Sequence, residues 1–464
     1  MGDIGLQNVD FTANQTVWEF PPGFVWGAAT SSYQIEGSIS ADGRGRSIWD
    51  DFCDVDGAIR DGSSGVDACR HYEMWRDDIA LMKSLNIGAY RFSIAWPRIV
   101  PDGDGAINSA GLDCYDQLVD GLLGAGIEPF VTLYHWDLPA ALEAKGGWLS
   151  RATAEAFTRY AGAVASRLGD RVTHWMTINE PYVVANLGYV TGRHAPGRTL
   201  SQAEGFDAAH HLMVGHALAM DSIRAESAAA SVGIALNFTP VTRLGDDPAD
   251  VHMAAVTDAI HNRWFLEPLA GLPYPAVASV DADWDADVVL RGDMDMIAAP
   301  IDFLGINYYT RQLVDSTGVL PAPEPTTTMA WEIHPDSLAE LLRWVDDVIG
   351  LDSYYITENG AAMPDDLVED GVVQDYDRIA YLADHIDVVE RAVTSGIGVQ
   401  GYFVWSLMDN FEWGLGYEQK FGLVAVDPET YRRGPKASAH WYRDMIAAAF
   451  PRDAEPGASD GESP

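Results

Sequence analysis

Residues 89–136 read AYRFSIAWPRIVPDGDGAINSAGLDCYDQLVDGLLGAGIEPFVTLYHW, and this stretch indicates how the rest of the chain is organised. Its first eight and last nine residues are mostly apolar, β-branched or aromatic, as expected of strands that are buried on both faces. Between them, apolar residues recur at helical spacing from Leu112 to Leu122, and Gly126 follows as a C-terminal stop. The stretch therefore predicts a strand, a helix and a second strand parallel to the first.

The same alternation continues on both sides of this unit. Further strand-length apolar runs lie at 24–30, 174–180, 232–240, 303–310, 354–360 and 401–409. Eight runs separated by helical patterns predict an α/β fold, a single (β/α)8 TIM barrel with extended loops at its C-terminal mouth. The alternative is a doubly wound open sheet. The number of runs disfavours it, and so does the lack of a glycine-rich phosphate loop after the first run, since Gly43-Arg44-Gly45-Arg46 matches no such fingerprint.

One of the predicted helices lies between the first two runs. Ile79, Met82 and Leu85 fall on one face of this helix, which is expected to pack against the barrel. The opposite face carries Asp78 and is expected to face water. Gly88 is expected to mark the end of the helix.

The chain is predicted to form one folded unit with two loose ends. Residues 17–450 are assigned to the barrel, because no Pro/Ser-rich linker interrupts them. Residues 1–16 are expected to be loosely ordered. Residues 451–464 (PRDAEPGASDGESP) contain no large apolar side chain and are expected to form an acidic, disordered tail.

The charge of the chain excludes two classes of partner. Lys and Arg together number 29 and Asp and Glu 69, which gives a formal net charge of −40. A field of this sign repels nucleic acid and anionic membranes, so neither is expected to bind. Two interpretations fit the acidity itself, a codon bias with a solvated acidic surface or an adaptation to high salt, and the composition does not decide between them.

Cysteine content and hydropathy bear on location. The three cysteines, Cys53, Cys69 and Cys114, form no C-x-x-C pair, so neither a zinc site nor a disulfide framework is expected. No signal peptide is expected, because residues 1–20 contain no basic segment followed by an apolar run, and no apolar run of the sequence is long enough to predict a membrane span. These features predict a cytoplasmic protein in a reducing compartment.

Polar and aromatic residues follow five of the eight predicted strands. They are His135-Trp136-Asp137, Asn179-Glu180, Asn307-Tyr308-Tyr309, Glu358-Asn359 and the series Trp405, Asp409, Glu412, Trp413. In a barrel the carboxyl ends of the strands meet at one mouth, which is where the chemistry of this fold occurs. Five such strand ends are difficult to explain by structural needs alone, so the sequence predicts an enzyme.

The composition of these strand ends points to a sugar substrate. Amide, imidazole and carboxylate groups hydrogen-bond to hydroxyls, and indole faces cover the apolar faces of pyranose rings. Trp96, Trp136, Trp405 and Trp413 lie near the predicted mouth. Two glutamates facing each other across it could cleave a glycosidic bond, one as acid and the other as nucleophile or base, and the sequence alone leaves retention and inversion open.

Several segments resemble the family 1 glycoside hydrolases, the β-glucosidase family. They are 24–30 (FVWGAAT), 33–37 (YQIEG), 90–98 (YRFSIAWPR), 134–139 (YHWDLP), 177–181 (TINEP), 305–309 (GINYY), 356–360 (ITENG) and 405–413 (WSLMDNFEW). The resemblance covers about residues 17–445. TINEP and ITENG in this order and spacing are very specific to the family.

The resemblance implies a retaining double displacement without cofactor or metal. It implies that Glu180 is the acid/base and Glu358 the nucleophile. The groups expected to hold the sugar hydroxyls are Gln34, His135, Asn179, Glu412 and Trp413, with Trp405 as a platform below the ring. The expected supporting residues are Tyr309 and Arg91 beside the nucleophile, Asn307 and Trp331 towards the aglycone, and the mouth aromatics Trp136 and Phe421.

The implied substrates are small β-glucosides and short β-linked oligosaccharides, cleaved at a terminal non-reducing β-D-glucosyl residue. Relatives that act on 6-phosphoglycosides place Lys and Tyr where this chain has Gln419 and Phe421, and they lack the Glu-Trp pair at Glu412. An ionised Glu412 is expected to repel a phosphate. Galactosides and fucosides, the aglycone and assembly into a homo-oligomer are left open.

Three rival functions make different demands on these residues. A non-catalytic sugar-binding protein would be expected to lack one of the two glutamates, and both are present. A thioglucosidase-type relative would carry Gln in place of Glu180. A transglycosylase shares the mechanism and is left open.

Overall fold

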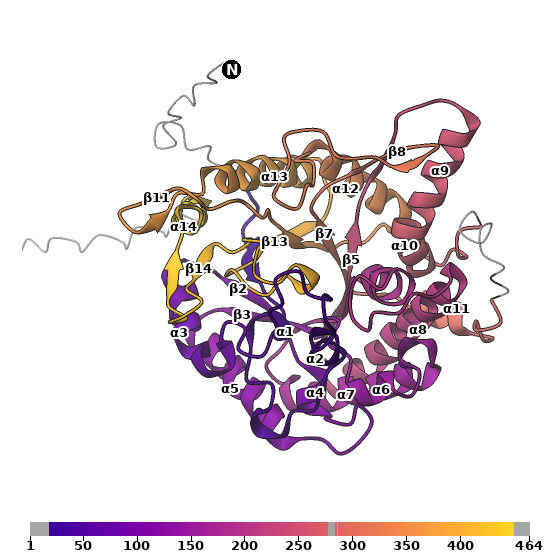
Figure 1. The fold of residues 1–464 in the computed structure, drawn as a ribbon, viewed down its shortest axis with the longest axis horizontal. Helices are drawn as coiled ribbons and strands as arrows, with labels where there is room; N and C mark the ends of the chain where they lie inside the picture. The colour runs from indigo at the N-terminus through magenta and orange to yellow at the C-terminus, as the bar shows by residue number, and fades with distance from the viewer. Residues whose placement is uncertain (1–17, 277–283, 285, 450–464) are drawn as a thin grey trace, which may run out of the picture.

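Eight parallel strands close into a barrel in the computed structural model, which describes residues 18–276, 284 and 286–449 (Figure 1). The strands are β1 (Val25–Ala29), β2 (Ala89–Ser93), β3 (Glu128–Tyr134), β4 (His174–Asn179), β5 (Ser231–Phe238), β7 (Phe303–Tyr308), β10 (Tyr354–Asn359) and β13 (Val399–Trp405). Each overlaps one of the eight predicted runs. The first strand pairs with both the second and the last, so the predicted TIM barrel is confirmed and an open sheet is excluded.

Helices surround the barrel and connect consecutive strands, as Figure 1 shows. The outer helices are α3 (His71–Ser84), α5 (Ser109–Ala125), α7 (Arg151–Leu168), α8 (Gln202–Glu226), α9 (Pro248–Asp258), α10 (Trp264–Leu269), α11 (Asp293–Ile297), α12 (Asp336–Ile349), α13 (Tyr376–Thr394) and α14 (Ala437–Ala449). Their apolar faces cover the sheet and form a continuous core with it. None of the helices in the described residues is long and apolar enough to cross a membrane.

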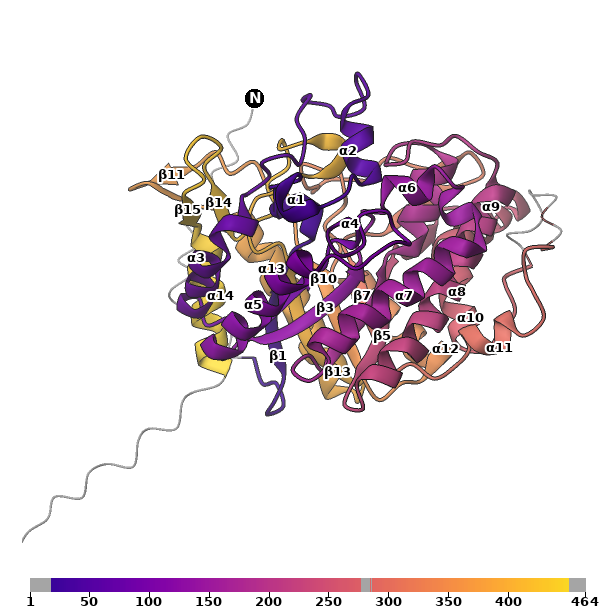
Figure 2. The same ribbon diagram turned by 90° about the horizontal axis from the view of Figure 1, so that it is seen from below.

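The connections that follow the strands are long and carry short elements of their own. The short helices are α1 (Ser32–Ile35), η1 (Ala41–Gly43), α2 (Ile48–Cys53), α4 (Trp96–Ile99), α6 (Ala140–Glu143), η2 (Gly147–Leu149), η3 (Val183–Val190), η4 (Ala259–Arg263) and η5 (Trp413–Leu415). The short strands are β6 (Val241–Arg243), β8 (Gln312–Asp315), β9 (Gly318–Val319), β11 (Val368–Glu369), β12 (Val372–Val373), β14 (Val424–Val426) and β15 (Arg433–Pro435). Figure 2 shows α1 and α2, which follow β1, at the upper end of the barrel. These are the extended loops that the sequence predicted.

Side chains fill the lower part of the barrel interior. Large residues such as Phe130, Phe303 and Phe403 pack there against small ones such as Ala89 and Ala235. This filling seals the end opposite the long loops. The open space for chemistry is therefore confined to the carboxyl ends of the strands.

The sequence predicted the ends of two outer helices, and one of the two predictions is confirmed. Gly126 closes α5 with φ +79, a left-handed conformation that glycine adopts without steric cost, as predicted. The prediction that Gly88 ends the preceding helix is wrong. Asn86 takes the left-handed position after α3 with φ 56, and asparagine is the usual second choice there.

The expectation that Asp78 faces water is also wrong. Asp78 is fully buried and hydrogen-bonds His71 Nδ1 at 2.8 Å. It also accepts hydrogen bonds from Arg433 Nε and NH2, at 2.8 and 2.9 Å. Because Arg433 belongs to β15 near the end of the chain, this buried ion pair links the first outer helix to the last hairpin.

The predicted loose ends, 1–16 and 451–464, lie outside the described residues. The described residues between them contain one closed barrel. The limits of 17–450 for the folded unit stay a prediction.

Candidate active site

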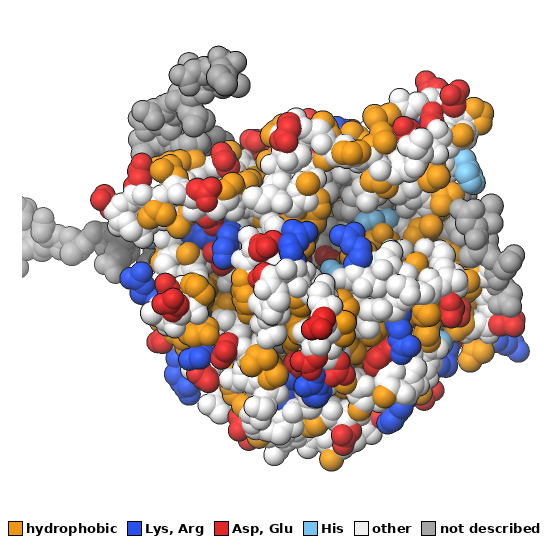
Figure 3. All heavy atoms as spheres, in the orientation of Figure 1, with side chains coloured by type: hydrophobic (Ala, Val, Ile, Leu, Met, Phe, Trp, Pro, Cys, Tyr) orange, Lys and Arg blue, Asp and Glu red, His pale blue; other side chains and the backbone are white. Residues whose placement is uncertain are grey.

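The polar strand ends meet on one side of the barrel. Asn307 on β7 lies opposite Glu358 on β10 in the strand pairing, and Glu180 directly follows β4. Figure 3 shows the face of the molecule that is hollowed near its centre, where the strand ends lie in Figure 1. Thirteen of the fourteen predicted site residues interact with at least one other predicted site residue. The exception, Gln34, is linked through Phe411, the neighbour of Glu412.

Glu358 is a buried carboxylate with two strong donors. Arg91 NH1 donates to Oε1 at 2.5 Å, and the Tyr309 hydroxyl donates to Oε2 at 2.6 Å. Both Glu358 and Arg91 are almost completely buried. Each oxygen of the carboxylate thus has a donor, and the guanidinium places a full positive charge beside one of them, which stabilises a negative charge on Glu358.

Glu180 has a weaker set of partners. It is 5% exposed, and Asn307 Nδ2 donates to its Oε1 at 2.6 Å. Burial is the main cause that raises the pKa of Glu180 well above its usual value, and the nearby Glu358 raises it further. The hydrogen bond from Asn307 and the charge of Arg91 act in the opposite direction without offsetting this. Burial and the neighbouring charge of Glu358 therefore favour the protonated form of Glu180.

Two asparagines connect the surroundings of the carboxylates. Arg91 NH2 donates to Asn179 Oδ1 at 2.6 Å, and Asn307 Nδ2 donates to the same oxygen at 3.0 Å. Because arginine can only donate, it fixes which end of the Asn179 amide is the oxygen. Asn179 Nδ2 therefore points to His135 Nε2, at 3.2 Å.

Glu412 is a third acidic group at this mouth. Burial, followed by the charge of Glu358, raises the pKa of Glu412 to about 8. The prediction that Glu412 is ionised at neutral pH is therefore wrong for the site without substrate. A desolvated carboxyl beside another carboxylate takes up a proton instead.

Aromatic rings form one wall of the site. The His135 ring stacks with Trp405 and Trp413, with interplanar angles of 15° and 16°. Trp136 packs on Trp413 with ring centroids 4.7 Å apart. Burial, followed by the charge of Arg91, lowers the pKa of His135 well below its usual value, so the ring is neutral.

Gln34 lies behind this wall. It is fully buried, and its Nε2 donates to Asn410 Oδ1 at 2.9 Å and to the Phe411 carbonyl at 2.8 Å. Its Oε1 accepts a hydrogen bond from the Ser31 hydroxyl at 2.6 Å. Both amide hydrogens are thus used to hold the loop that carries Glu412, and Oε1 keeps one free lone pair.

A second aromatic group lies on the side of Tyr309. Trp331 lies 5.3 Å from Tyr309 and 6.2 Å from Phe421 between ring centroids. Trp331 is half-buried, whereas Phe421 is almost completely buried. This group lines the site beside Tyr309, the donor to Glu358.

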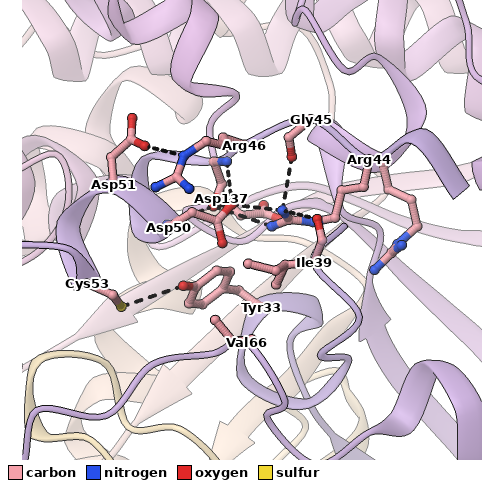
Figure 4. Close-up of polar contacts among 12 residues, drawn as sticks. Tyr33, Ile39, Arg44, Gly45, Arg46, Asp50, Asp51, Cys53, Val66 and Asp137 are labelled. Atoms are coloured by element: carbon pink, nitrogen blue, oxygen red, sulfur yellow. Dashed lines mark hydrogen bonds and ion pairs between the residues drawn. The ribbon is translucent and has the colours of Figure 1, made fainter. Parts of the chain in front are cut away.

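Several residues expected near the mouth do not join it, Trp96 and Asp137 among them. Trp96 is fully buried and stacks on Tyr160 in the layer between the barrel and its helices. Asp137 is also fully buried, and its Oδ2 accepts a hydrogen bond from the Ser32 hydroxyl at 3.0 Å. Figure 4 shows Asp137 beside the ion pair between Arg44 and Asp50, so it supports the loop after β3 from behind.

Three residues of the mouth have left-handed backbone conformations that non-glycine residues rarely adopt. They are Trp136, Glu180 and Trp413, with φ of 75, 50 and 50. Such a conformation costs about 1–2 kcal/mol for a residue with a Cβ atom. Conformations of this kind gather at functional sites because surrounding contacts hold them in place.

The structure adds supporting residues that the motifs alone did not single out. Tyr33 and Trp49 pack behind Trp413, with centroids 6.2 and 4.5 Å away. The hydroxyl of Thr357 donates to Asn307 Oδ1 at 2.6 Å. A sequence signal existed for Thr357, which directly precedes Glu358 in the ITENG segment, whereas nothing in the sequence connects Trp49 to this wall.

Comparison with known proteins agrees with this arrangement. Residues 16–450 match the model of the family described as glycosyl hydrolase family 1. Beta-glucosidase A of Thermotoga maritima is 43% identical over 439 residues, which cover 93% of this chain and 98% of that protein. A bifunctional beta-D-glucosidase/beta-D-fucosidase of Bifidobacterium breve is 44% identical over 461 residues, covering 92% and 98%.

Solved structures give the same result. The beta-glucosidase of Thermotoga maritima in complex with glucoimidazole superposes with a TM-score of 0.90 at 41% identity, covering 93% of this chain and 99% of that one. The AHE enzyme of Alicyclobacillus herbarius superposes with a TM-score of 0.91 at 49% identity, covering 94% and 99%. With a family match along nearly its whole length, two glutamates at facing strand ends and relatives of the same length, this chain belongs to glycosyl hydrolase family 1.

Proposed function

We propose that the chain is a retaining β-glucosidase that removes terminal non-reducing β-D-glucosyl residues by double displacement, with Glu358 as nucleophile and Glu180 as acid/base. The observation that carries this proposal is the different environment of the two glutamates. Glu358 has donors on both oxygens, one of them a guanidinium, whereas Glu180 has an amide donor in a desolvated position. One carboxyl is thus ready to attack while the other is ready to give a proton.

The first half-reaction uses both groups at once. A carboxylate oxygen of Glu358 forms a bond to the anomeric carbon, and the bond from that carbon to the glycosidic oxygen breaks. The proton of Glu180 moves to the departing oxygen. The aglycone leaves as an alcohol, and the sugar remains as an ester of Glu358.

The second half-reaction reverses these roles. Water gives a proton to Glu180 and attacks the anomeric carbon, and the ester bond to Glu358 breaks. Esterification removes the negative charge that raises the pKa of Glu180, so Glu180 becomes a better general base at this stage. Two inversions at the anomeric carbon give a β product.

The remaining site residues are assigned to the substrate on chemical grounds. Trp405 offers an aromatic face to the glucosyl ring, and His135, Asn179, Glu412 and Trp413 offer hydrogen-bonding groups to its hydroxyls. Protonated Glu412 can donate to one hydroxyl and accept from another. Gln34 contributes its free Oε1 lone pair and holds the loop of Glu412 from behind.

The aglycone is assigned to the second aromatic group. Trp331 packs there against Tyr309 and Phe421, and it is half-buried, whereas Phe421 is almost completely buried. Asn307 is assigned to this part of the site through its hydrogen bond to Glu180, which gives its proton to the aglycone oxygen. Trp136 supports the glucosyl side, because its ring contacts Trp413 and its Nε1 donates to the Asn179 carbonyl at 2.9 Å.

The proposal also covers the cellular compartment, the limits of the folded unit and the substrates. Cys53, Cys69 and Cys114 are all free thiols, which supports action in a reducing compartment. The folded unit spans 17–450. The substrates are small β-glucosides and short β-linked oligosaccharides, and the Bifidobacterium breve relative supports testing β-fucosides beside them.

Product stereochemistry is the decisive test. The expected result with p-nitrophenyl β-glucoside is β-glucose as the first-formed sugar in proton NMR, before mutarotation. α-Glucose as the first product would exclude the double displacement. Rates on a panel of aryl β-glucosides, β-galactosides and β-fucosides then define the preferred sugar, and product analysis at high acceptor concentration measures how far transglycosylation competes with hydrolysis.

A further inference from the structure

Glu180 lies at one end of a chain of hydrogen bonds that has a fixed direction. Arg91 has only donors, so the oxygen of Asn179 must face it, at 2.6 Å. That oxygen requires a donor from Asn307, so Asn307 Nδ2 faces both Asn179 Oδ1, at 3.0 Å, and Glu180 Oε1, at 2.6 Å. The oxygen of Asn307 is left on the far side of the amide, where it needs a donor.

The hydroxyl of Thr357 supplies that donor. Its Oγ1 lies 2.6 Å from Asn307 Oδ1, and Thr357 is fully buried. Gly305 makes this approach possible, because a Cβ atom at residue 305 would lie only 2.9 Å from Oγ1 and Cγ2 of Thr357. The close contact between β7 and β10 at this point therefore brings the hydroxyl to the amide.

We propose that Thr357 is a positioning residue that holds the Asn307 amide so that its Nδ2 donates to Glu180. The proposal deepens the proposed function and rests on Glu180 as the acid/base. Without the hydroxyl, Asn307 Oδ1 is a buried acceptor with no donor, which is costly. The amide then shifts or turns to find another partner, and either movement weakens its hydrogen bond to Glu180.

This weakening has a predictable direction. A hydrogen bond donated to a carboxylate favours the ionised form, so its loss raises the pKa of the acid. The charged or titratable groups that face Glu180 are Glu358 from β10, Arg91 from β2, Glu412 from the loop after β13, Tyr309 from the end of β7 and, across Asn179, His135 from the end of β3. None of these is altered by a change at residue 357 that keeps its volume.

The test compares Thr357→Val, which keeps the shape and removes the hydroxyl, with Thr357→Ser, which keeps the hydroxyl. The readout is the basic limb of kcat/KM against pH, which reports the acid of the free enzyme. Phenyl β-glucoside is the substrate, because its leaving group needs a proton. Thr357→Val should move the basic limb to higher pH by about one unit, since a hydrogen bond to a charged group affects a pKa on this scale. Thr357→Ser should keep the wild-type limb.

A second substrate separates Glu180 from Glu412, whose pKa of about 8 also falls in this range. The 2,4-dinitrophenyl β-glucoside needs little protonation, so its profile should not move with Thr357→Val. A shift of equal size on both substrates would assign the effect to Glu412 and overturn the proposal. Superimposable profiles for Val and Ser, in variants with wild-type unfolding temperatures, would also overturn it.

Two controls keep the outcome interpretable. If Thr357→Val does not fold, Thr357→Ala and Thr357→Ser form the replacement pair. Both substitutions remove the γ-methyl group of the threonine, and only serine keeps the hydroxyl. The basic limb on phenyl β-glucoside should be absent in Glu180→Ala. Its persistence there would refute Glu180 as the acid. Its absence, together with matching Val and Ser profiles, would refute only the role of Thr357.

Discussion

Carboxylates occupy two contrasting regions of this molecule, the mouth of the barrel and the α5–α7 surface, where Asp113, Asp116 and Asp120 of α5 lie beside Arg167 and Arg171. At the mouth, Glu180 is almost completely buried and its pKa is raised well above the usual value, chiefly by burial. On the α5–α7 surface, Asp113 and Asp120 are more than half exposed and form ion pairs with Arg167 and Arg171. The same functional group is thus desolvated in one region and paired with arginines near solvent in the other.

Asp116 shows what separates them. It lies on the α5–α7 surface, and burial alone would raise its pKa, but hydrogen bonds from Arg171 and Arg167 more than offset this and lower it. At the mouth, Arg91 shares the site with three acidic side chains, those of Glu180, Glu358 and Glu412. Of these three, the described contacts show Arg91 donating a hydrogen bond to Glu358 only. Burial and the number of neighbouring cations therefore decide together whether the pKa of a carboxyl rises or falls. At the mouth, the acidic side chains are buried and outnumber the arginine that pairs with them, so the pKa values of Glu180 and Glu412 are raised.

The largest effect is expected from replacing Glu358, the carboxylate at the mouth that accepts a hydrogen bond from Arg91. Glu358→Gly should abolish hydrolysis of every glucoside, because no covalent intermediate can form. The loss is measured as the turnover of p-nitrophenyl and 2,4-dinitrophenyl β-glucosides by the variant and by the wild type. Substantial activity on either in a pure preparation would show that Glu358 is not the nucleophile.

The next effect tests the protonated member of the pair. Glu180→Ala should lower the rate of glycosylation by about 10²–10⁴-fold for phenyl β-glucoside, the usual contribution of general acid catalysis. The first step with 2,4-dinitrophenyl β-glucoside should change far less, which single-turnover kinetics can follow. Equal losses on the two substrates would contradict the assignment of Glu180 as acid.

A third experiment brings an additional negative charge to the mouth. Activity on p-nitrophenyl β-glucoside 6-phosphate should be lower than on the unphosphorylated substrate by about 10²-fold or more, the cost of burying a dianion without a cation. Gln419 accepts a hydrogen bond from Thr328 and Phe421 is apolar, so neither offers a positive charge. The comparison is of the two kcat/KM values, and a higher value for the phosphate would overturn the substrate class.

Salt should distinguish the two regions without any mutation. If the charge of −40 reflects adaptation to salt, screening of repulsion between exposed carboxylates should raise Tm between dilute buffer and molar sodium chloride. A rise of about 1 °C corresponds to about 1 kcal/mol for a chain of this size, because the entropy of unfolding is about 2.1 cal/mol/K per residue. The basic limb of the pH profile should move little, because the mouth is buried. A Tm that stays constant or falls would favour codon bias as the source of the acidity.

The smallest effect is expected on the α5–α7 surface itself. Asp116→Asn removes a carboxylate that pairs with Arg167 and Arg171 at 2.9 and 2.5 Å, and should lower stability by about 1 kcal/mol or less, as partly exposed ion pairs do. Its kcat/KM should equal that of the wild type. A large loss of activity would mean that the two regions are coupled through α5 and β3.

The fold was predictable because each strand coincides with a short, mostly apolar run, and eight such runs separated by helical patterns are compatible with few architectures. Finer features followed local chemistry only where no tertiary partner competed. Gly126 ends its helix as predicted, whereas Asn86 replaced Gly88, and Asp78 turned inward because Arg433, more than 350 residues later in the chain, pairs with it. A partner so distant cannot be inferred from helical periodicity.

The residues of the candidate site were predictable because strand ends and family motifs coincide, while their physical states were not. The sequence identified Glu412 but not its protonation, which depends on how deeply the loop is buried. It identified Gln34 but not that both its amide hydrogens are used by the loop behind it. Trp96 follows a barrel strand as the mouth tryptophans do, so the sequence does not distinguish it from them. Only the structure shows that Trp96 stacks on Tyr160 in the core.

The left-handed backbone at Trp136, Glu180 and Trp413 has a consequence for protein engineering. At Trp136 and Trp413, glycine would relax the backbone but delete a buried ring, a loss of about 3–5 kcal/mol that outweighs the relief. At Glu180, glycine would relax the backbone and also remove a desolvated carboxyl, so the substitution that favours stability is the one that deletes the proposed acid/base. Selection for thermostability without a screen for turnover would therefore drift towards inactive variants at Glu180. A directed-evolution library that leaves this residue fixed and varies the outer helices avoids this conflict.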